Sequence, residues 1–224
     1  MVSLFDLRKS AVVVIDVYRA TSAITAALAS GVKEVIPVGT VEEAKAYKAK
    51  GFLAAAERKG AVVKGFDLGN SPIALSQAEH KGKSIVLTTS NGTKALLKTE
   101  GAKEVIIASF LNEQAVVNYL AEHHNNVIFL CAGWKDRFNL EDTAVAGAIS
   151  RGLEAKGWHT HCDSALAAMH LFDIAKDRMP EFMKNASHTT RLGHLGLSDD
   201  LAFCNRRNEY NIVPVYENGT IRLK

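Results

Sequence analysis

Short apolar runs alternate along this chain with longer stretches in which apolar residues recur at helical spacing. Five runs rich in β-branched residues are predicted as strands, at about 11–16, 34–38, 84–88, 104–107 and 126–130. Most of them are apolar throughout instead of alternating, which is typical of strands that helices cover on both faces. The pattern therefore predicts an α/β protein with three α/β/α layers around a mostly parallel sheet.

The last third of the chain has a different pattern. Helical periodicity dominates after Asn139, and strand signals return only in IVPVY (212–216) and TIRL (220–223). Asn218 and Gly219 separate these two runs and predict a hairpin turn. We expect a single unit over residues 1–224, with a helix-rich C-terminal lobe at about 140–224.

One segment of the chain resembles another. GVKEVI at 31–36 recurs as GAKEVI at 101–106, an offset of 70 residues. Either a βα unit is duplicated, at 11–47 and 81–119, or both copies are only helix ends followed by a charged strand entry. If the duplication is real, the loops YRATS (18–22) and TTSNGT (88–93) are equivalent. We hypothesise that they face one cleft at the carboxyl ends of their strands, where ligands of open α/β sheets bind.

Composition narrows the class of protein. With 224 residues, 47% of them hydrophobic and 23% charged, the chain is long enough for one large domain and ordinary for a globular protein, alone or as a homodimer. A net charge of +3 is too small for a general nucleic-acid binder, so we expect a small anionic ligand and no nucleic acid. Three widely spaced cysteines favour reduced thiols in the cytoplasm. No apolar run is long enough for a membrane span or a signal peptide.

The loop after the first predicted strand carries a carboxylate, a guanidinium and two hydroxyls. Asp16 ends the strand, Arg19 follows, and Thr21 and Ser22 begin an alanine-rich helix. The start of a helix favours a phosphate, which Arg19 can hold, while Asp16 can bind a divalent cation or attack phosphorus. The alternative is structural: Asp16 pairs with Arg19 and the hydroxyls cap the helix.

A second loop of this kind follows the third predicted strand. Ser90, Asn91, Gly92 and Thr93 lie between that strand and residues of helical character. Their hydroxyls and amides can form another anion cradle. The alternative, a hairpin turn at Asn91 and Gly92, is disfavoured because no strand pattern follows.

Two further segments carry acidic residues. Asp67, Asn70 and Ser71 stand in a glycine-containing loop before a proline suited to the first position of a helix. Glu141 and Asp142 stand in the first turn of another predicted helix. Carboxylates in a first turn are partners of the helix dipole in most proteins and metal ligands in a minority.

Several chemistries are excluded by missing motifs. The chain has no G-x-S-x-G, H-E-x-x-H, G-x-G-x-x-G or paired-cysteine pattern, so hydride transfer and zinc proteolysis are not expected. Tyr18 also stands where a D-x-D phosphatase of the haloacid-dehalogenase type would carry its second aspartate.

Taken in order, the motifs resemble the ComB family of 2-phosphosulfolactate phosphatases. The resemblance covers about 11–215 and rests on VVVIDVYRATSAI, AAERKG, GFDLGNSP, TTSNGTKAL, SFLN, CAG, RFNLED with AGAI, LGLSDDLAFC and VPV. It implies a magnesium-dependent acid phosphatase that converts 2-phosphosulfolactate to sulfolactate and phosphate, a step towards coenzyme M in organisms that make it. It also implies an α/β/α fold with the site between two intertwined lobes.

The resemblance, read together with the loops above, gives an expected site. The expected catalytic residues are Asp16 and Arg19. Mg²⁺ is expected to be bound by some of Asp16, Glu57, Asp67, Glu141 and Asp142. The residues expected to bind the substrate or its phosphate are Thr21, Ser22, Arg58, Asn70, Ser71, Ser90, Asn91, Gly92, Thr93 and Arg137.

Two alternatives remain beside this function. The chain could hydrolyse a different phospho-hydroxy acid, because fold and motif do not fix the substrate, or it could bind a small anion without catalysis. The role of Asp16 also has two interpretations, metal ligand or nucleophile. We predict a ligand, because the neighbouring Tyr18, with an ordinary pKa of about 10, is a poor acid for the leaving oxygen.

Overall fold

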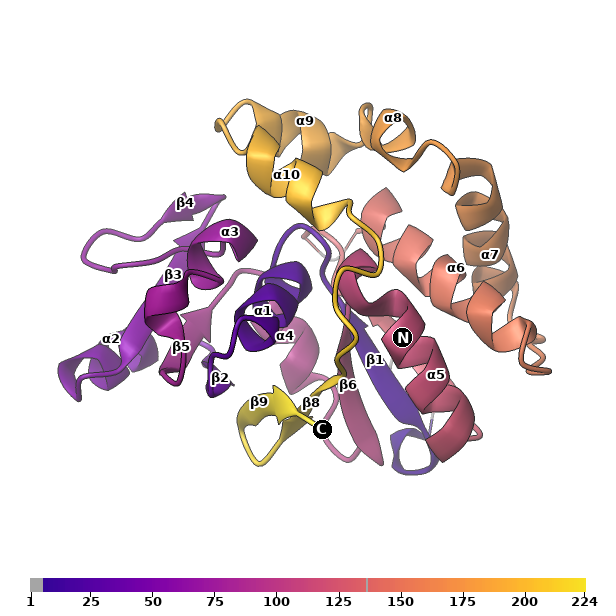
Figure 1. Cartoon of the computed structure of the whole chain (residues 1–224), viewed down its shortest axis with the longest axis horizontal. Helices are drawn as coiled ribbons and strands as arrows, with labels where there is room; N and C mark the ends of the chain where they lie inside the picture. The colour runs from indigo at the N-terminus through magenta and orange to yellow at the C-terminus, as the bar shows by residue number, and fades with distance from the viewer. Residues whose placement is uncertain (1–5, 136) are drawn as a thin grey trace.

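The structure is a computed structural model that describes residues 6–135 and 137–224 (Figure 1). Its strands are β1 (Ala11–Ile15), β2 (Glu34–Pro37), β3 (Leu53–Arg58), β4 (Ala61–Val62), β5 (Ser84–Thr88), β6 (Glu104–Ala108), β7 (Val127–Cys131), β8 (Pro214–Glu217) and β9 (Thr220–Leu223). Its α-helices are α1 (Ala20–Ala29), α2 (Val41–Ala49), α3 (Pro72–Leu75), α4 (Gly92–Leu97), α5 (Glu113–His123), α6 (Leu140–Glu154), α7 (Asp163–Ala175), α8 (Met179–Met183), α9 (Ser187–Gly193) and α10 (Ser198–Cys204). Short 3-10 helices are η2 (Leu7–Lys9), η3 (Ala78–His80) and η4 (Phe110–Asn112).

Within the described residues, nine strands form one sheet in the order β4-β3-β5-β2-β9-β8-β6-β1-β7. The strands β3, β5 and β2 make one parallel trio, and β6, β1 and β7 make the other. The antiparallel hairpin of β8 and β9 lies between the trios and pairs with β6 on one side and β2 on the other. The α/β class and its largely parallel strands are therefore confirmed.

The chain crosses twice between the two halves of the sheet. It leaves β1 in one trio, passes through α1 and enters β2 in the other. It then leaves β5 in that second trio, passes through α4 and returns to β6. These reciprocal crossings make the two halves intertwined. The repeats GVKEVI and GAKEVI lead into β2 and β6, which hold equivalent places beside the hairpin, while a common origin of the two units stays a prediction.

Three apolar clusters explain the layers. Alternate residues of β1 face opposite ways: Val13 and Ile15 pack with α5 and α6, whereas Val12 and Val14 pack with α1 and α4. Residues of the other trio join that second cluster, so both halves of the sheet pack on α1 and α4. A third cluster lies between α2 and the outer side of β3 and β5. The three-layer prediction is thus confirmed, with a bent sheet around the central helices.

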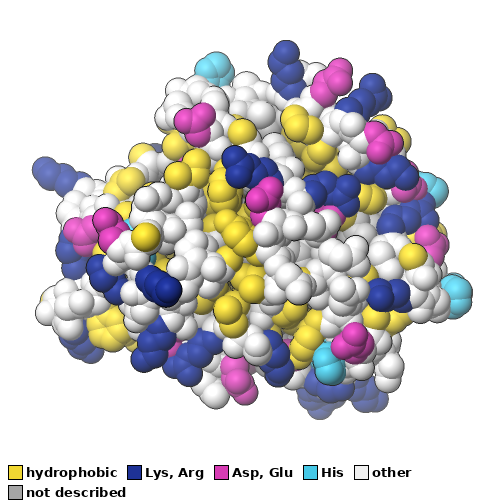
Figure 2. All heavy atoms as spheres, viewed as in Figure 1, with side chains coloured by type: hydrophobic (Ala, Val, Ile, Leu, Met, Phe, Trp, Pro, Cys, Tyr) yellow, Lys and Arg dark blue, Asp and Glu magenta, His cyan; other side chains and the backbone are white. Residues whose placement is uncertain are grey.

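The C-terminal part of the chain has two roles in the fold. Helices α6 and α7 pack closely together beside β7, and α8, α9 and α10 continue over the carboxyl ends of the strands (Figure 1). The chain then runs back across the molecule and ends in the central hairpin. Figure 2 shows apolar atoms in a band down the middle of this face, with most charged side chains nearer its margins. In the part of the chain that is described, no helix combines the length and hydrophobicity that crossing a bilayer requires.

Ion pairs join the hairpin to both trios. Glu34 at the start of β2 accepts from Arg222 at 2.8 Å and from the Ser84 hydroxyl at 2.7 Å. Glu104 at the start of β6 accepts from Lys224 at 2.8 Å and contacts His124 at 2.7 Å. The glutamates at the same position of the two sequence repeats therefore each accept a hydrogen bond from a basic residue at the end of the hairpin, one on each side of it.

Candidate active site

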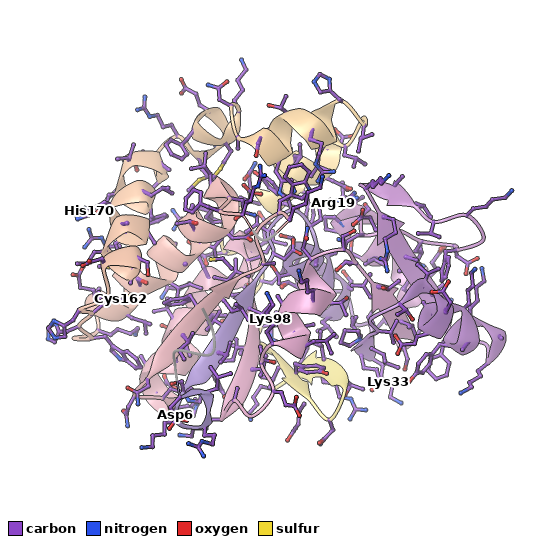
Figure 3. The ribbon with its side chains drawn as sticks, turned by 180° about the vertical axis from the view of Figure 1, so that it is seen from behind. Asp6, Arg19, Lys33, Lys98, Cys162 and His170 are labelled. Carbon is purple, nitrogen blue, oxygen red and sulfur yellow. The ribbon has the colours of Figure 1, made fainter. Side chains whose placement is uncertain are left out.

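A cavity open to solvent lies where the carboxyl ends of β1, β3 and β5 meet the C-terminal helices. The residues that line it are Asp16, Tyr18, Arg19, Glu57, Lys59, Gly60, Asn70, Thr89, Ser90, Asn91, Trp134, His188, Arg191 and Leu192. In Figure 3, Arg19 lies between the C-terminal helices and the β3–β4 hairpin.

Hydrogen bonds within the β1–α1 loop determine its shape. The Asp16 amide donates to the Thr21 hydroxyl at 3.0 Å, and the Thr21 amide donates to the Asp16 carbonyl at 2.9 Å. The Ser22 hydroxyl donates to the Val17 carbonyl at 2.8 Å. Thr21 and Ser22 are buried and do not line the cavity. Their hydroxyls therefore shape the loop that presents the Asp16 carboxyl group to the cavity.

The β5–α4 loop lies directly against the β1–α1 loop. Thr89 and Thr93 bond reciprocally, each amide donating to the other hydroxyl at 3.3 Å. A Cβ atom added to Gly92 would lie 2.5 Å from the Ala20 Cβ and 3.0 Å from Asp16 Oδ2, closer than van der Waals contact allows. Glycine is thus required for this approach. Both loops line one cavity, through Arg19 on one side and Ser90 and Asn91 on the other, while the remaining residues of the two predicted cradles do not line it.

Arg19 is held by groups from two other parts of the chain. Its side chain is 5% exposed, with Nη1 bonded to the buried Asp200 of α10 and Nη2 donating to the Gly60 carbonyl at 3.1 Å. The second oxygen of Asp200 accepts from the Ser71 hydroxyl at 2.7 Å, and Ser71 also caps α3. Asp200 therefore links the β1–α1 loop, α3 and α10 around one wall of the cavity.

The turn between β3 and β4 forms another wall. Glu57 at the end of β3 accepts from the Gly60 amide, while Lys59 is exposed at the rim. A Cβ added to Gly60 would lie 2.5 Å from Leu195 Cδ1, so this turn packs against the segment between α9 and α10. Asn70 is 3% exposed, and its Oδ1 has no hydrogen-bond partner within the described chain.

Four carboxyl groups concentrate negative charge behind and beside the cavity. Burial, and then the charge of Asp142, raise the pKa of Asp16 well above its ordinary value, and Glu57 and Glu141 add to this effect. Burial and Glu141 raise the pKa of Asp142 to about 7. The oxygens of Asp142 accept from the Val17 amide at 2.8 Å, the Gly133 amide at 3.0 Å and the Asn139 side chain at 3.0 Å. Asp142 thereby joins the ends of β1 and β7.

Glu141 pairs with a histidine on the far side of the cavity. Its Oε1 lies 2.5 Å from Nδ1 of His188, and both side chains are buried. The ring of His188 lies 5.9 Å from that of Trp134, over which the Arg191 guanidinium is placed at 5.3 Å. His188 and Arg191 are three residues apart on α9, so both can face the cavity from one side of the helix.

The oxygen atoms around the cavity fit a hard divalent cation for which the protein supplies only some of the ligands. Within residues 6–135 and 137–224, no three His, Cys, Asp or Glu side chains form a metal-binding group. Mg²⁺ in enzymes commonly takes one or two carboxylates and completes its shell with water and substrate oxygens. Asp16, Glu57 and the unpartnered Asn70 Oδ1 offer oxygens of this kind in one cavity. A cation there would also offset the charge repulsion that adds to burial in raising the pKa of Asp16.

Six of the residues expected from the sequence line the cavity, namely Asp16, Arg19, Glu57, Asn70, Ser90 and Asn91. Others support it from behind through the contacts described above, namely Thr21, Ser22, Ser71, Gly92, Thr93, Glu141 and Asp142. The remaining three expected residues do not line the cavity and make other contacts. Arg58 bonds the Glu57 carbonyl and the Thr88 hydroxyl, Asp67 pairs with Lys48 at 2.8 Å, and Arg137 is exposed in a bridge with Trp134.

Sequence reasoning missed the part of the site that comes from the C-terminal helices. Trp134, His188, Arg191 and Asp200 were not among the expected residues, although SDD of LGLSDDLAFC contains Asp200. A lone histidine or arginine in a helical segment carries no spacing signal, because its partner lies far along the chain. The docking of α9 and α10 over the strand ends brings His188 and Arg191 to the cavity and Asp200 to Arg19, whereas Trp134 reaches the cavity from the segment between β7 and α6.

Comparison with known proteins gives a consistent result along nearly the whole chain. The sequence model of a family described as 2-phosphosulpholactate phosphatase matches residues 3–219. A protein of Thermotoga maritima named "Probable 2-phosphosulfolactate phosphatase" is 43% identical over 212 residues, covering 95% of this chain and 91% of that protein. Proteins of the same name from Caldanaerobacter subterraneus subsp. tengcongensis and Clostridium acetobutylicum are 40% identical over 221 residues and 37% over 220. These matches cover 97% and 96% of this chain, and 92% and 93% of the relatives.

Proposed function

Since the chain belongs to the 2-phosphosulpholactate phosphatase family of phosphoric monoester hydrolases, we propose that it hydrolyses 2-phosphosulfolactate to sulfolactate and phosphate with Mg²⁺ as cofactor. The observation that carries the proposal is the cavity that residues of the β1–α1 and β5–α4 loops line together, with Asp16, Arg19 and Glu57 on its walls. A phosphoryl group needs both positive charge and hydrogen-bond donors, and strand-to-helix loops supply the donors.

The charges around the cavity suit a small polyanion. The proposed substrate carries a phosphate, a carboxylate and a sulfonate, in total about three to four negative charges at neutral pH. Arg19, Lys59 and Arg191 line the cavity from three different segments. Arg19 is neutralised in part by Asp200, so Lys59 and Arg191 are the side chains whose charge we assign to the carboxylate and sulfonate.

The phosphoryl group is proposed to lie between Asp16 and the β5–α4 loop. Ser90 and Asn91 line the cavity on that side and can donate hydrogen bonds to its equatorial oxygens. Asp16 and Glu57, with the Asn70 amide oxygen, would hold Mg²⁺ there. When bound, the cation would neutralise charge on the oxygens of the transferring group.

Phosphate release from 2-phosphosulfolactate tests this proposal. We expect release by the purified protein with added Mg²⁺, at least about tenfold slower release after EDTA treatment, and recovery when Mg²⁺ is restored, because a cation contributes several kcal/mol to such a transition state. A matched ester that lacks the sulfonate should have a lower kcat/KM. A higher kcat/KM for that ester would favour another phospho-hydroxy acid, and tight phosphate binding without turnover of any ester would favour an anion-binding protein.

The variant Asp16→Asn separates the two roles of that residue. If Asp16 is a metal ligand, the variant should lose turnover, and its Mg²⁺ affinity, measured by calorimetry on the folded protein, should also fall. A trapped acyl-phosphate on Asp16 in the wild type, or unchanged metal affinity in the variant, would identify a nucleophile instead.

A place in coenzyme M formation and a cytoplasmic location belong to the same proposal. The three free cysteines agree with that location.

A further inference from the structure

A buried carboxylate–imidazole pair borders the cavity opposite the strand-end loops. Glu141 is fully buried and His188 is 3% exposed, and their Oε1 and Nδ1 atoms lie 2.5 Å apart. With Glu141 as a carboxylate, which only accepts hydrogen bonds, Nδ1 of His188 is the donor in this contact. The pair therefore fixes both the ring orientation and the role of each ring nitrogen.

The other ring nitrogen of His188 is left for a ligand. Nε2 is buried and has no hydrogen-bond partner within the described chain, while the residue itself lines the cavity. A buried polar atom without a partner is costly in a folded protein and is rare unless a ligand, an ion or water satisfies it. The ring centroid of Trp134 lies 5.9 Å from that of His188, and a ring contact at this distance does not replace a hydrogen-bond partner. His188 therefore borders the cavity with one ring nitrogen unpaired, and this nitrogen is the candidate contact for what the cavity binds.

The other side chains of the cavity are poor proton donors for an ester oxygen. The Tyr18 hydroxyl already donates to Asn205 Oδ1 at 2.6 Å, and burial raises its pKa further above 10. Arginine and lysine, the types of the other cationic side chains of the cavity, are poor proton donors in general. Asp16 and Glu57 are assigned above to the cation. Among the side chains that line the cavity, the imidazole of His188 is the remaining one of a type that commonly serves as a general acid.

We propose that His188 is the general acid of this active site and that Glu141 is its positioning residue. The inference rests on the proposed phosphatase function and adds to it the group that protonates the leaving oxygen. The alcohol of a phospho-hydroxy acid is a much weaker acid than a phenol, so its alkoxide leaves slowly without a proton donor.

The proposed step balances as a simple hydrolysis. The bond between phosphorus and the ester oxygen breaks as a water oxygen bonds to phosphorus. The Nε2 proton of His188 passes to the departing ester oxygen, which leaves as an alcohol. Of the two protons of the water, one stays on the phosphate and the other returns to Nε2 of His188. Glu141 keeps its bond to Nδ1 throughout and stabilises the charged form of the ring.

Leaving-group dependence distinguishes this role from a structural one. For His188→Gln we expect kcat with 2-phosphosulfolactate, an alkyl ester, to fall by about 100-fold or more, the range typical of general acid catalysis. With p-nitrophenyl phosphate, whose phenol leaves readily as an anion, the fall should be less than about fivefold. Equal losses with both esters, or no loss with either, would overturn the proposal.

Two further variants sharpen the experiment. Glu141→Gln keeps an oxygen that can accept from Nδ1 but removes the charge, so it should show the same selective loss at smaller magnitude. His123→Gln changes an exposed histidine on α5 and should match the wild type with both esters. Equal losses for Glu141→Gln with both esters would show that it does not act through His188.

The wild type offers a measurement that does not depend on the folding of any variant. A series of aryl phosphates of increasing phenol pKa should give a kcat/KM that changes only shallowly along the series, because protonation relieves the charge on the leaving oxygen. A steep decline would overturn the proposal. Turnover of aryl phosphates without turnover of 2-phosphosulfolactate would refute the proposed substrate and leave the role of His188 to be decided by this series. Absence of turnover with every ester would refute both.

Discussion

The ion pair between Arg19 and Asp200 joins residues 181 positions apart, and both side chains are almost completely buried. Removing two charges from water is costly, and good hydrogen-bond geometry is needed to offset that cost. Here Asp200 also accepts from Ser71, and Arg19 also donates to the Gly60 carbonyl. The pair therefore holds Arg19, a candidate phosphate-binding side chain, in one orientation. Asp200 also neutralises part of the positive charge that Arg19 could offer to a phosphate.

Asp200→Asn should be strongly destabilising, because it leaves the Arg19 guanidinium buried without a counter-charge. We expect the free energy of unfolding to fall by about 3 to 5 kcal/mol, measured by urea unfolding. The adjacent Asp199→Asn is the matched control, since Asp199 is exposed in the same turn of α10 and should change stability by less than about 1 kcal/mol. Similar effects of the two substitutions would contradict the importance of the buried pair.

At this scale the sequence predicted the residues that stand in strand-to-helix loops. Strand ends and a helix-starting proline mark the loops of four residues that line the cavity, namely Asp16, Asn70, Ser90 and Asn91. The role of His188 could not be predicted, because it depends on the contact with Glu141, which lies 47 positions away in the sequence. Asp67 carries the same kind of local signal as Asp16, yet the fold turns it towards Lys48. Local pattern therefore finds candidates, and only tertiary packing selects among them.

The junction of the two strand-to-helix loops depends on one glycine. Gly92→Ala should separate the loops, because the new Cβ would meet the Ala20 Cβ and Asp16 Oδ2. Overpacking of this kind costs about 1 to 3 kcal/mol, and a displacement of about 1 Å can lower kcat/KM by about 100-fold. We expect phosphatase assays of the variant to show that loss while circular dichroism remains native-like.

Gly193→Ala is the control for this substitution. Gly193 ends α9, and a Cβ added there would meet nothing within 4 Å. Its substitution should leave kcat/KM unchanged and stability unchanged or higher by up to about 1 kcal/mol. Full activity of Gly92→Ala would show that the two loops need not touch.

Among the elements, strands with β-branched residues were predictable and the others were not. The five predicted strands exist with ends shifted by at most a residue or two, as does the hairpin at Asn218 and Gly219. Strand β3 was missed because LAAAER is rich in alanine, a helix former, and only its burial between β5 and α2 makes it a strand. That omission matters, because β3 carries Glu57 to the cavity.

The place of the hairpin in the sheet could not be read from its sequence. The turn residues predict a hairpin but not the strands that pair with it. In the sheet, β8 and β9 lie between the two trios, whereas the local pattern gives no reason to separate the trios. Without these strands, β2 and β6 would each expose an unpaired edge. The whole molecule therefore depends on a segment that contributes no residue to the cavity lining.

A chain that stops at Val213 tests this dependence. We expect it to lose cooperative urea unfolding and to elute as aggregates in size-exclusion chromatography, because two sheet edges are open. Removal of Lys224 alone, which breaks its exposed ion pair with Glu104, should cost less than about 1 kcal/mol and leave the protein monodisperse or in its native assembly. Cooperative unfolding of the shorter chain would contradict the central role of the hairpin.

The order in which the strands are synthesised gives the hairpin a further consequence. The ribosome adds residues 214–223 after all seven other strands, yet these residues occupy the middle of the sheet. The nascent chain therefore cannot close its sheet strand by strand as it emerges, and its two halves await a late segment while their edges are open. Such a chain is exposed to misassembly during translation, so we expect nascent forms of this protein to depend on chaperones until the hairpin has been released.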